Sequence, residues 1–365
     1  MISFEALREC GCWWGDPWWE SPQNRSHSPL SIAEIQQRIG TLKQHFNEQW
    51  VRKALARDPA HPVVRYFWGA TGTHPFDDLM WIGALMTEAA PTKGLPGKVA
   101  ELIEQDALAT QFEIQVAAVL AAGGWPVRFI SRVKESKTPD LVADMLGIPV
   151  AIECKRLGRE AWEQWVMKLM VQTGKTLRRP HLAGWDVEVL FNPRLSELLM
   201  DDDAINQAML AEIDDRISDL LASIDVARCP EIFHVAEVAS LEAHKRVAGR
   251  PTPGIGGVEI SGVARLRRVI NNGVRRALPQ LQAHVGSAIA VYCDTLPGQA
   301  LLEVAMAGVV AADPEGTANL AAVAIVSPLN NNGAADRVWT NRKHRLPDLV
   351  AEIEQRFRLG FARVA

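Results

Sequence analysis

Three short apolar runs between residues 127 and 157 are separated by a polar loop and by the segment Gly147-Ile148-Pro149. Runs of this length, rich in Val, Ile, Phe and Leu, predict β-strands. A type II′ hairpin needs glycine at its first central position, so we expect Gly147 and Ile148 to form the turn between the second and third strands. The segment is therefore predicted to contain one strand followed by a tight hairpin.

This turn fixes which residues of the hairpin lie opposite each other. Counting back from the turn, Asp140 lies opposite Lys155 and Val142 lies opposite Glu153. Because opposed residues share a face, Asp140, Glu153 and Lys155 are expected to point the same way. Asp140 and Glu153 are then diagonal neighbours, roughly 7–8 Å apart at the backbone. The other face of the last strand carries the apolar set expected to pack inward: Val150, Ile152 and Cys154.

A helix is predicted over residues 111–122, ending at Gly123-Gly124. Glu113 lies on its apolar stripe, because the residues three, four and seven positions later are Val, Ala and Leu. A glutamate on a buried face needs a partner. The strand that begins at Val127 would return beside this helix and bring Glu113 towards the two acids of the hairpin.

Helical patterns dominate the chain before this region. A capping box formed by Ser31 and Glu34 predicts a helix start at residue 31. The predicted helical stretches are 31–46, 47–57, 62–70 and 76–88. Pro and Gly between 91 and 97 indicate a boundary. We therefore expect residues 1–94 to form a helical N-terminal module that begins with a segment rich in tryptophan: Trp13, Trp14, Trp18 and Trp19.

Residues 95–365 are predicted to form one α/β domain with a central mixed sheet flanked by helices. Its core is expected at about 97–192, ending with a strand at 186–191 that completes the mixed sheet. A helical insertion is expected at about 194–262. Further strands and helices predict a C-terminal α/β extension: a basic helix at 263–284, strands at 288–293 and 321–327, and helices at 299–312 and 347–358.

Composition narrows the class of protein. Of 365 residues, 48% are hydrophobic and 22% charged, which is ordinary for a globular protein, and the net charge of −4 argues against a basic coat for nucleic acid. The five cysteines form no disulfide framework, which favours a reducing, cytoplasmic location. The longest apolar run, near 299–312, is too short to span a bilayer, so no membrane partner is expected.

The order helix, strand, strand, hairpin, helix, with Glu113, Pro139-Asp140 and Glu153-Cys154-Lys155, resembles the PD-(D/E)xK phosphodiesterase superfamily, the restriction endonuclease-like proteins. The resemblance implies a nuclease with a restriction endonuclease-like core. Carboxylates without a soft ligand suit Mg²⁺ or Mn²⁺. The resemblance implies that Asp140 and Glu153 coordinate this metal, with Glu113 assisting directly or through water. It also implies that Lys155 orients or deprotonates the attacking water.

Basic residues indicate where nucleic acid, most simply DNA, would bind. Arg156 follows the motif, and the helix at 263–284 carries arginines at helical spacing: Arg265, Arg268, Arg275 and Arg276. That stripe is equally consistent with a solvated face or with pairing to the acidic region at 194–225. On the helix predicted at 160–178, Gln172 is a further polar residue of the kind that some family members use beside the metal.

Other readings of the same residues stay open. Asp140 and Lys155 could form an exposed cross-strand ion pair, and Glu113 could pair with an unrelated arginine. Asp144, nearer the turn, is expected to be solvated. A catalytically silent, nuclease-like subunit that binds nucleic acid or assembles with proteins in a bacterial defence or mobile-element system is the alternative function. The tryptophan-rich start would then serve a protein partner or a homo-oligomer, or else fold back as a flap on the helices that follow it.

Overall fold

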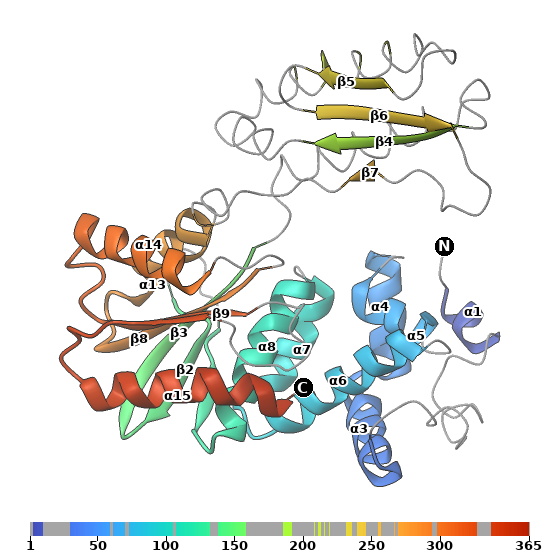
Figure 1. Cartoon of the computed structure of the whole chain (residues 1–365). Coiled ribbons are helices and arrows are strands. Elements are labelled where there is room, and N and C mark those ends of the chain that lie inside the picture. Colours follow the sequence, from blue (N-terminus) through green and yellow to red (C-terminus); the bar gives the residue numbers. More distant parts are fainter. Residues whose placement is uncertain are drawn as a thin grey trace. The chain divides into compact units, whose positions relative to one another are not determined.

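The structure is a computed structural model of the chain, shown as a cartoon in Figure 1. It describes the residues 3–9, 30–58, 61–69, 73–104, 107–131, 138–157, 269–293, 298–326 and 337–364, the backbone of four strands between 185 and 256, and single positions between 208 and 266. The chain divides into two compact units. The first unit comprises residues 1–157 and 269–365, and the second comprises residues 158–268.

The first unit is built on a six-stranded mixed sheet (Figure 1). Its strands are β1 (Val127–Phe129), β2 (Leu141–Met145), β3 (Ile148–Arg156), β8 (Gly286–Tyr292), β9 (Leu320–Val326) and β10 (Arg337–Thr340). They lie in the order β1-β2-β3-β8-β9-β10. The central strands β3, β8 and β9 are parallel, whereas the remaining neighbours pair antiparallel. The expected α/β class with a central mixed sheet is therefore confirmed.

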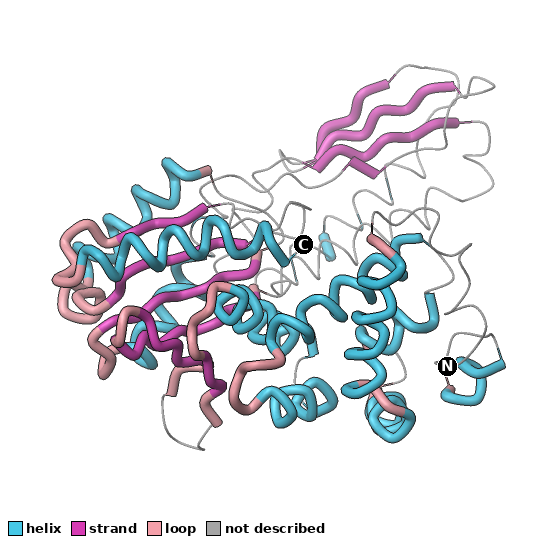
Figure 2. The backbone as a smooth tube through the Cα atoms, turned by 90° about the horizontal axis from the view of Figure 1, so that it is seen from below, coloured by secondary structure: helices cyan, strands magenta, loops and turns pink. Residues whose placement is uncertain are grey.

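Helices cover both faces of this sheet (Figures 1 and 2). Helices α8 (Ala107–Ala122) and α15 (Pro347–Val364) pack on the face that carries Ile152 and Cys154. The other face carries Ala151 and packs against η3 (Val269–Val274), α13 (Arg275–Leu281) and α14 (Gln299–Ala312). Alternate residues of β3 therefore enter two different apolar clusters. Because the strand is buried on both faces, its sequence is a nearly continuous hydrophobic run. The face of Glu153 is consequently an interior face as well.

The N-terminal helices join the same apolar cluster as α8. They are α1 (Phe4–Glu9), α3 (Ile32–His45), α4 (Glu48–Arg57), α5 (Pro62–Gly69), α6 (Thr73–Ala89) and α7 (Leu95–Glu104). The predicted capping box is confirmed, since Ser31 and Glu34 bond each other's backbone groups at the start of α3. Near the boundary expected at position 94, Lys93 exchanges backbone hydrogen bonds of 3.0 Å with Val127 and Phe129 of β1. Lys93 therefore extends the edge of the main sheet. The position of the expected boundary lies inside the first unit, which includes residues 1–157.

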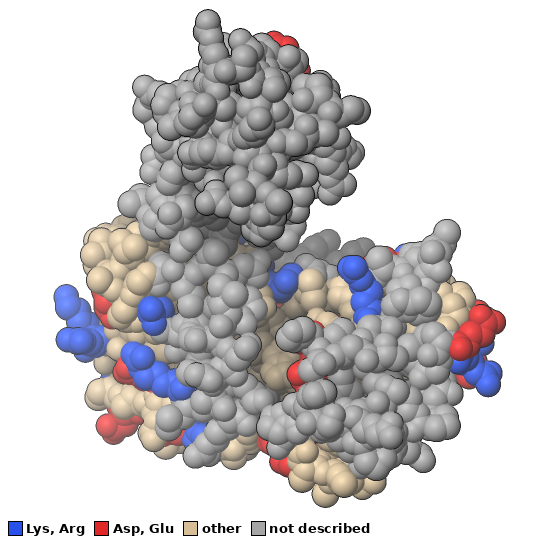
Figure 3. Space-filling view, turned by 45° about the vertical axis from the view of Figure 1, so that its right-hand side comes forward, with Lys and Arg blue, Asp and Glu red and all other residues tan. Residues whose placement is uncertain are grey.

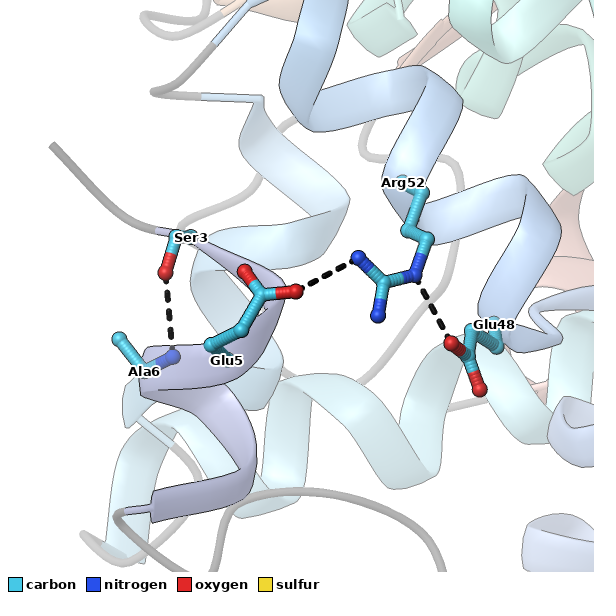
Figure 4. A network of polar contacts seen from close by, with 5 residues as sticks. All are labelled: Ser3, Glu5, Ala6, Glu48 and Arg52. Carbon is cyan, nitrogen blue, oxygen red and sulfur yellow. Dashed lines mark hydrogen bonds and ion pairs between the residues drawn. The ribbon is translucent and has the colours of Figure 1, made fainter.

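Arg52 connects the first helix to α4 (Figure 4). Its guanidinium donates to Glu5 of α1 at 2.7 Å and to Glu48 of α4 at 2.8 Å. It also lies 4.2 Å from the centre of the Phe4 ring. Both carboxylates are exposed, so such ion pairs contribute little on their own. The buried side chains of Phe4 and Leu7 provide the main anchor of α1.

The second unit contains its own four-stranded sheet. Its strands are β4 (Trp185–Phe191), β5 (Glu231–Val235), β6 (Ala239–Lys245) and β7 (Ile255–Gly256), in the order β5-β6-β4-β7. The strand predicted at 186–191 is thus confirmed as a strand, but its expected place in the main sheet is wrong because it pairs with β6 and β7. Strands also occur inside the segment 194–262, which had been expected to be a helical insertion. The main sheet is completed instead by β8 and β9, which follow the second unit.

The turn of the predicted hairpin lies one residue earlier than expected. Met145 pairs with Ile148, so Leu146 and Gly147 form the turn, and both have positive φ, 55° and 76°. Positive φ at both central residues is the type I′ geometry, which matches the twist of the flanking strands. The correction shifts the pairing by two residues, and a shift of two keeps every side chain on its predicted face.

This turn predicts a stabilising substitution. Leu146 is 62% exposed and holds a left-handed backbone conformation that asparagine adopts more easily than leucine. We expect Leu146→Asn to raise the free energy of unfolding by about 0.5–1 kcal/mol, measured by urea denaturation. Gly147→Ala, which places a Cβ on a residue with positive φ, should lower it. A destabilised Leu146→Asn variant would instead favour the turn at Gly147-Ile148.

Candidate functional site

Asp140 and Glu153 lie together at one end of the hairpin. Leu141 pairs with Ile152, so the preceding residue, Asp140, lies opposite Glu153 and not opposite Lys155 as predicted. The Asp140 Oδ2 atom accepts a hydrogen bond of 2.9 Å from the backbone N–H of Cys154. Asp140 is 4% exposed and Glu153 is 1% exposed. The corrected register thus brings two carboxylates closer together than the diagonal arrangement expected from the sequence.

Glu153 is held in an environment that disfavours its charge. Its Oε1 atom contacts the Lys155 ammonium, whereas its Oε2 atom is buried and has no hydrogen-bond partner. Burial and the neighbouring charge of Asp140 raise the pKa of Glu153 to about 8, and the contact with Lys155 offsets only part of this rise. A buried carboxylate oxygen without a partner is costly, so this atom is a natural ligand for a cation.

Lys155 occupies the more accessible side of the pair. Its side chain is 25% exposed, and its Nζ atom donates to Glu153 and, at 3.2 Å, to Oε1 of Gln280 on α13. No pattern in the sequence points to Gln280, because it lies 125 positions beyond Lys155 and reaches it only through the packing of α13 on β3. Gln172, the polar residue noted in the sequence, lies outside the described residues.

Glu113 is buried on α8, as its apolar stripe indicated, and its carboxylate forms an ion pair with a lysine. Lys98 of α7 donates to Glu113 Oε2 at 2.7 Å and to Glu101 Oε2 at 2.7 Å. The negative charge of Glu113 still raises the pKa of Glu153, so the two acids lie within electrostatic reach. Of the three predicted metal ligands, the structure brings Asp140 and Glu153 together and holds Glu113 on Lys98.

The donor set fits a hard divalent cation at Asp140 and Glu153. Carboxylate oxygens are what Mg²⁺ and Mn²⁺ bind, usually one or two from protein with water and phosphate in the remaining positions. Among the described residues, no group of three or more His, Cys, Asp or Glu side chains is arranged to hold a metal ion. The thiol of Cys154 is no soft ligand at neutral pH, because burial and the nearby acids raise its pKa well above the usual value. The unpartnered Glu153 oxygen is the feature that fits the ion.

The predicted nucleic-acid contacts are only partly described. Arg156 lies at the end of β3 with its guanidinium 5.3 Å from the centre of the Tyr292 ring. Arg275 and Arg276 are exposed at the start of α13, the helix that carries Gln280, whereas Arg265 and Arg268 lie outside the described residues, as do the four N-terminal tryptophans. On the face in Figure 3, described Lys and Arg side chains lie in separate small groups.

A groove of about 650 Å³ lies away from these acids, along the edge strand β10 and between α14 and α15. Three of its charged side chains are engaged within the protein: Glu303, Glu354 and Arg358. Arg358 bonds Glu354 at 3.0 Å, and Glu303 accepts from Gln299 at 2.8 Å. Gln299 and Arg358 also donate to the Val338 carbonyl of β10, which covers part of the open sheet edge. None of the predicted site residues lines this groove.

Comparisons with models of known protein families, with curated protein sequences and with solved structures find no match to this chain. The interpretation of function therefore depends on the residues themselves. Within the described part of the chain, no helix is long and apolar enough to cross a membrane.

The buried acid pair predicts how stability depends on pH. The pKa of Glu153 is about 8 in the folded chain against an ordinary value of 4.5. Between pH 4.5 and pH 8, the folded chain therefore keeps a proton on this residue that the unfolded chain has lost. Stability from this residue is then fully present below about pH 4.5 and falls as pH rises to 8. Glu153→Gln removes that titration. With a chelator present, we expect the thermal midpoint of this variant minus that of wild type to become more positive as the pH is raised from 5 to 8.5. A constant difference across this range would contradict the raised pKa.

Proposed function

We propose that this chain is a Mg²⁺- or Mn²⁺-dependent nuclease of the PD-(D/E)xK type, which hydrolyses phosphodiester bonds, most simply in DNA. The observation that carries the proposal is the buried Asp140 and Glu153 pair, with one unpartnered carboxylate oxygen and a lysine ammonium beside it. An acid pair with no catalytic or binding role would be expensive to keep in an apolar sheet.

The arrangement of elements supports the finer assignment to a restriction endonuclease-like core. Helix α8 is followed by the antiparallel strands β1, β2 and β3, and helix α13 leads into β8, which is parallel to β3. The Pro139-Asp140 segment stands at the start of β2, and Glu153-Cys154-Lys155 stands near the end of β3. The order α8, β1, β2 and β3 agrees with the first elements of the family resemblance, whereas the helix predicted at 160–178 lies outside the described residues.

Asp140 and Glu153 are the residues that would hold the ion. When bound, a divalent ion supplies an acidified water molecule and positive charge at the scissile phosphate. The hydrogen bond from the Cys154 N–H group holds the Asp140 carboxylate in a fixed orientation beside Glu153. Lys155, steadied by Gln280, orients the attacking water and offsets charge that develops on the phosphate. A single charge contact of this kind is worth on the order of 4 kcal/mol at 4 Å and an effective dielectric near 20.

One observation favours the alternative of a silent, nuclease-like binding or assembly subunit. The ammonium of Lys98 bonds the Glu113 carboxylate, so among the described residues only two acids converge. A silent subunit would bind nucleic acid in a salt-sensitive way and would not respond to changes at Asp140 or Glu153. The same cleavage assay separates the two functions.

Metal-dependent cleavage is the direct test of the proposal. We expect the protein to cut plasmid or oligonucleotide DNA with Mg²⁺ or Mn²⁺ and not with chelator. Asp140→Ala, Glu153→Ala and Lys155→Ala should each reduce the rate by roughly 100-fold or more, because each removes a group that acts on the attacking water or the metal. Asp144→Ala is the matched control, since this exposed acid lies on the same face of β2. Folded protein without cleavage in any divalent metal would overturn the proposal.

Gln280 gives a second test. Gln280→Leu removes the hydrogen bond to Lys155 without touching either acid. We expect a slower cleavage rate, by roughly 10-fold, with unchanged Mn²⁺ affinity, since the amide positions the ammonium through one neutral-to-charged hydrogen bond. Gln282→Leu, two residues further along the same segment, serves as the control. An unchanged rate in Gln280→Leu would show that Lys155 is positioned without this contact.

A further inference from the structure

Arg156 ends strand β3, directly after Lys155. Successive side chains of a strand point to opposite faces of the sheet, so Lys155 and Arg156 lie on either side of this strand end. Arg156 pairs with Tyr292 of β8, and its guanidinium carbon lies over the Tyr292 ring, 5.3 Å from the ring centre. Both side chains are partly exposed. The end of β3 therefore carries a second cation beside the ammonium of the candidate site.

Tyr292 is an anchored ring. It meets the ring of Phe112 on α8 edge to face, with the ring centres 5.4 Å apart and the planes at 61°. Phe112 is 2% exposed and directly precedes Glu113. An aromatic ring attracts a cation through its quadrupole but adds no net charge. Tyr292 thus fixes the position of the Arg156 guanidinium without neutralising its charge.

Tyr66 brings the N-terminal helices to the same place. It belongs to α5, which lies beside α8, and its partly buried ring packs against the apolar cluster that also borders Tyr292. Burial and the charge of Asp78 raise the pKa of the Tyr66 phenol, and the charge of Arg156 offsets part of this rise. The phenol therefore keeps its proton at neutral pH and can donate a hydrogen bond.

The groups at this strand end suit a phosphodiester chain. Lys155 lies beside the acid pair on one face of β3, and Arg156 lies with Tyr66 on the other. Arginine, lysine and tyrosine side chains are common donors to the phosphate oxygens of nucleic acids. A backbone that crosses the end of β3 would meet the ammonium at one phosphate and the guanidinium at a neighbouring phosphate. Contacts of this kind hold the backbone and carry no information about base sequence.

We propose that Arg156, held over Tyr292, and the hydroxyl of Tyr66 bind a phosphate of the substrate backbone next to the phosphate at Lys155. The N-terminal helices then take part in substrate binding, and this contact is independent of base sequence. The inference rests on the proposed function, because it assigns the surface that carries the substrate of that centre.

DNA binding in the presence of chelator tests the role of Arg156 without cleavage. The probe is a short fluorescent DNA duplex, in two unrelated sequences, measured by anisotropy over a range of salt. We expect Arg156→Gln to weaken binding about tenfold on both sequences and to reduce the slope of log affinity against log salt by about 0.9, the value for one phosphate contact. Arg156→Lys keeps the charge and should restore the slope. Arg342→Gln is the matched control, because this exposed arginine follows β10 at the opposite end of the sheet.

The outcomes separate this inference from the proposed function. An unchanged slope in Arg156→Gln, a loss confined to one sequence, or a wild type that binds neither duplex would overturn the inference, even if the wild type cuts DNA with Mg²⁺. A wild type that binds with the expected change in slope but cuts no DNA in any divalent metal would overturn the nuclease proposal alone.

Two tyrosine substitutions test the other members of the cluster in the same assay. Tyr66→Phe keeps the packed ring and loses only the hydroxyl, so we expect about threefold weaker binding with an unchanged salt slope, because the lost donor is neutral. Tyr292→Phe keeps the ring under Arg156 and should bind like wild type, whereas Tyr292→Leu should bind about threefold more weakly. Wild-type affinity in Tyr66→Phe would overturn the part assigned to the N-terminal helices. Equal affinities of the two Tyr292 variants would overturn the part assigned to the ring.

Discussion

Two acidic side chains lie opposite each other in a sheet that is covered by helices on both faces. The fold brings Asp140 and Glu153 together because the β2–β3 pairing places them at the same level, and the Cys154 N–H group fixes one of them. The other polar residues described near the site contact or balance these two acids. Lys155 and Gln280 contact the pair on the accessible side, and Lys98 balances the third acid behind it. The apolar residues of β3 and β8 supply the rigid frame.

The sequence predicted correctly which face of the hairpin each side chain occupies, but it did not predict which residues pair across the two strands. Side chains alternate with a period of two, so the error of two residues in register left Asp140, Glu153 and Lys155 on their common face. The turn was misplaced because a glycine at position 147 fits either of two turn types, and only the structure reveals positive φ at Leu146. Similarly, residues 186–191 were recognisable as a strand, but the choice of partner strand depends on distant residues that local pattern does not encode.

Two residues of the site had no signal in the sequence. Lys98 stands in an ordinary amphipathic helix, where a lysine is usually solvated, and its burial results from the packing of α7 against α8. Gln280 reaches Lys155 through the packing of α13 on β3, and the second unit, inserted between these two elements, separates the residues widely in sequence. Glu113 was predicted in part. Its position on an apolar stripe predicted burial and a need for a partner, whereas the identity of that partner depends on the tertiary fold.

The insertion of residues 158–268 has a consequence for how the chain folds. Strand β3 ends at Arg156, and its parallel neighbour β8 begins at Gly286, so the central pairing of the sheet closes a very long loop. Pairings of such high contact order form slowly. During synthesis, β3 keeps an open edge while the second unit is being made, and an early, independently folded second unit would shorten the effective loop. The contact between Lys155 and Gln280 can therefore form only after the second unit has been synthesised, whereas the Asp140 and Glu153 pair lies in a local hairpin.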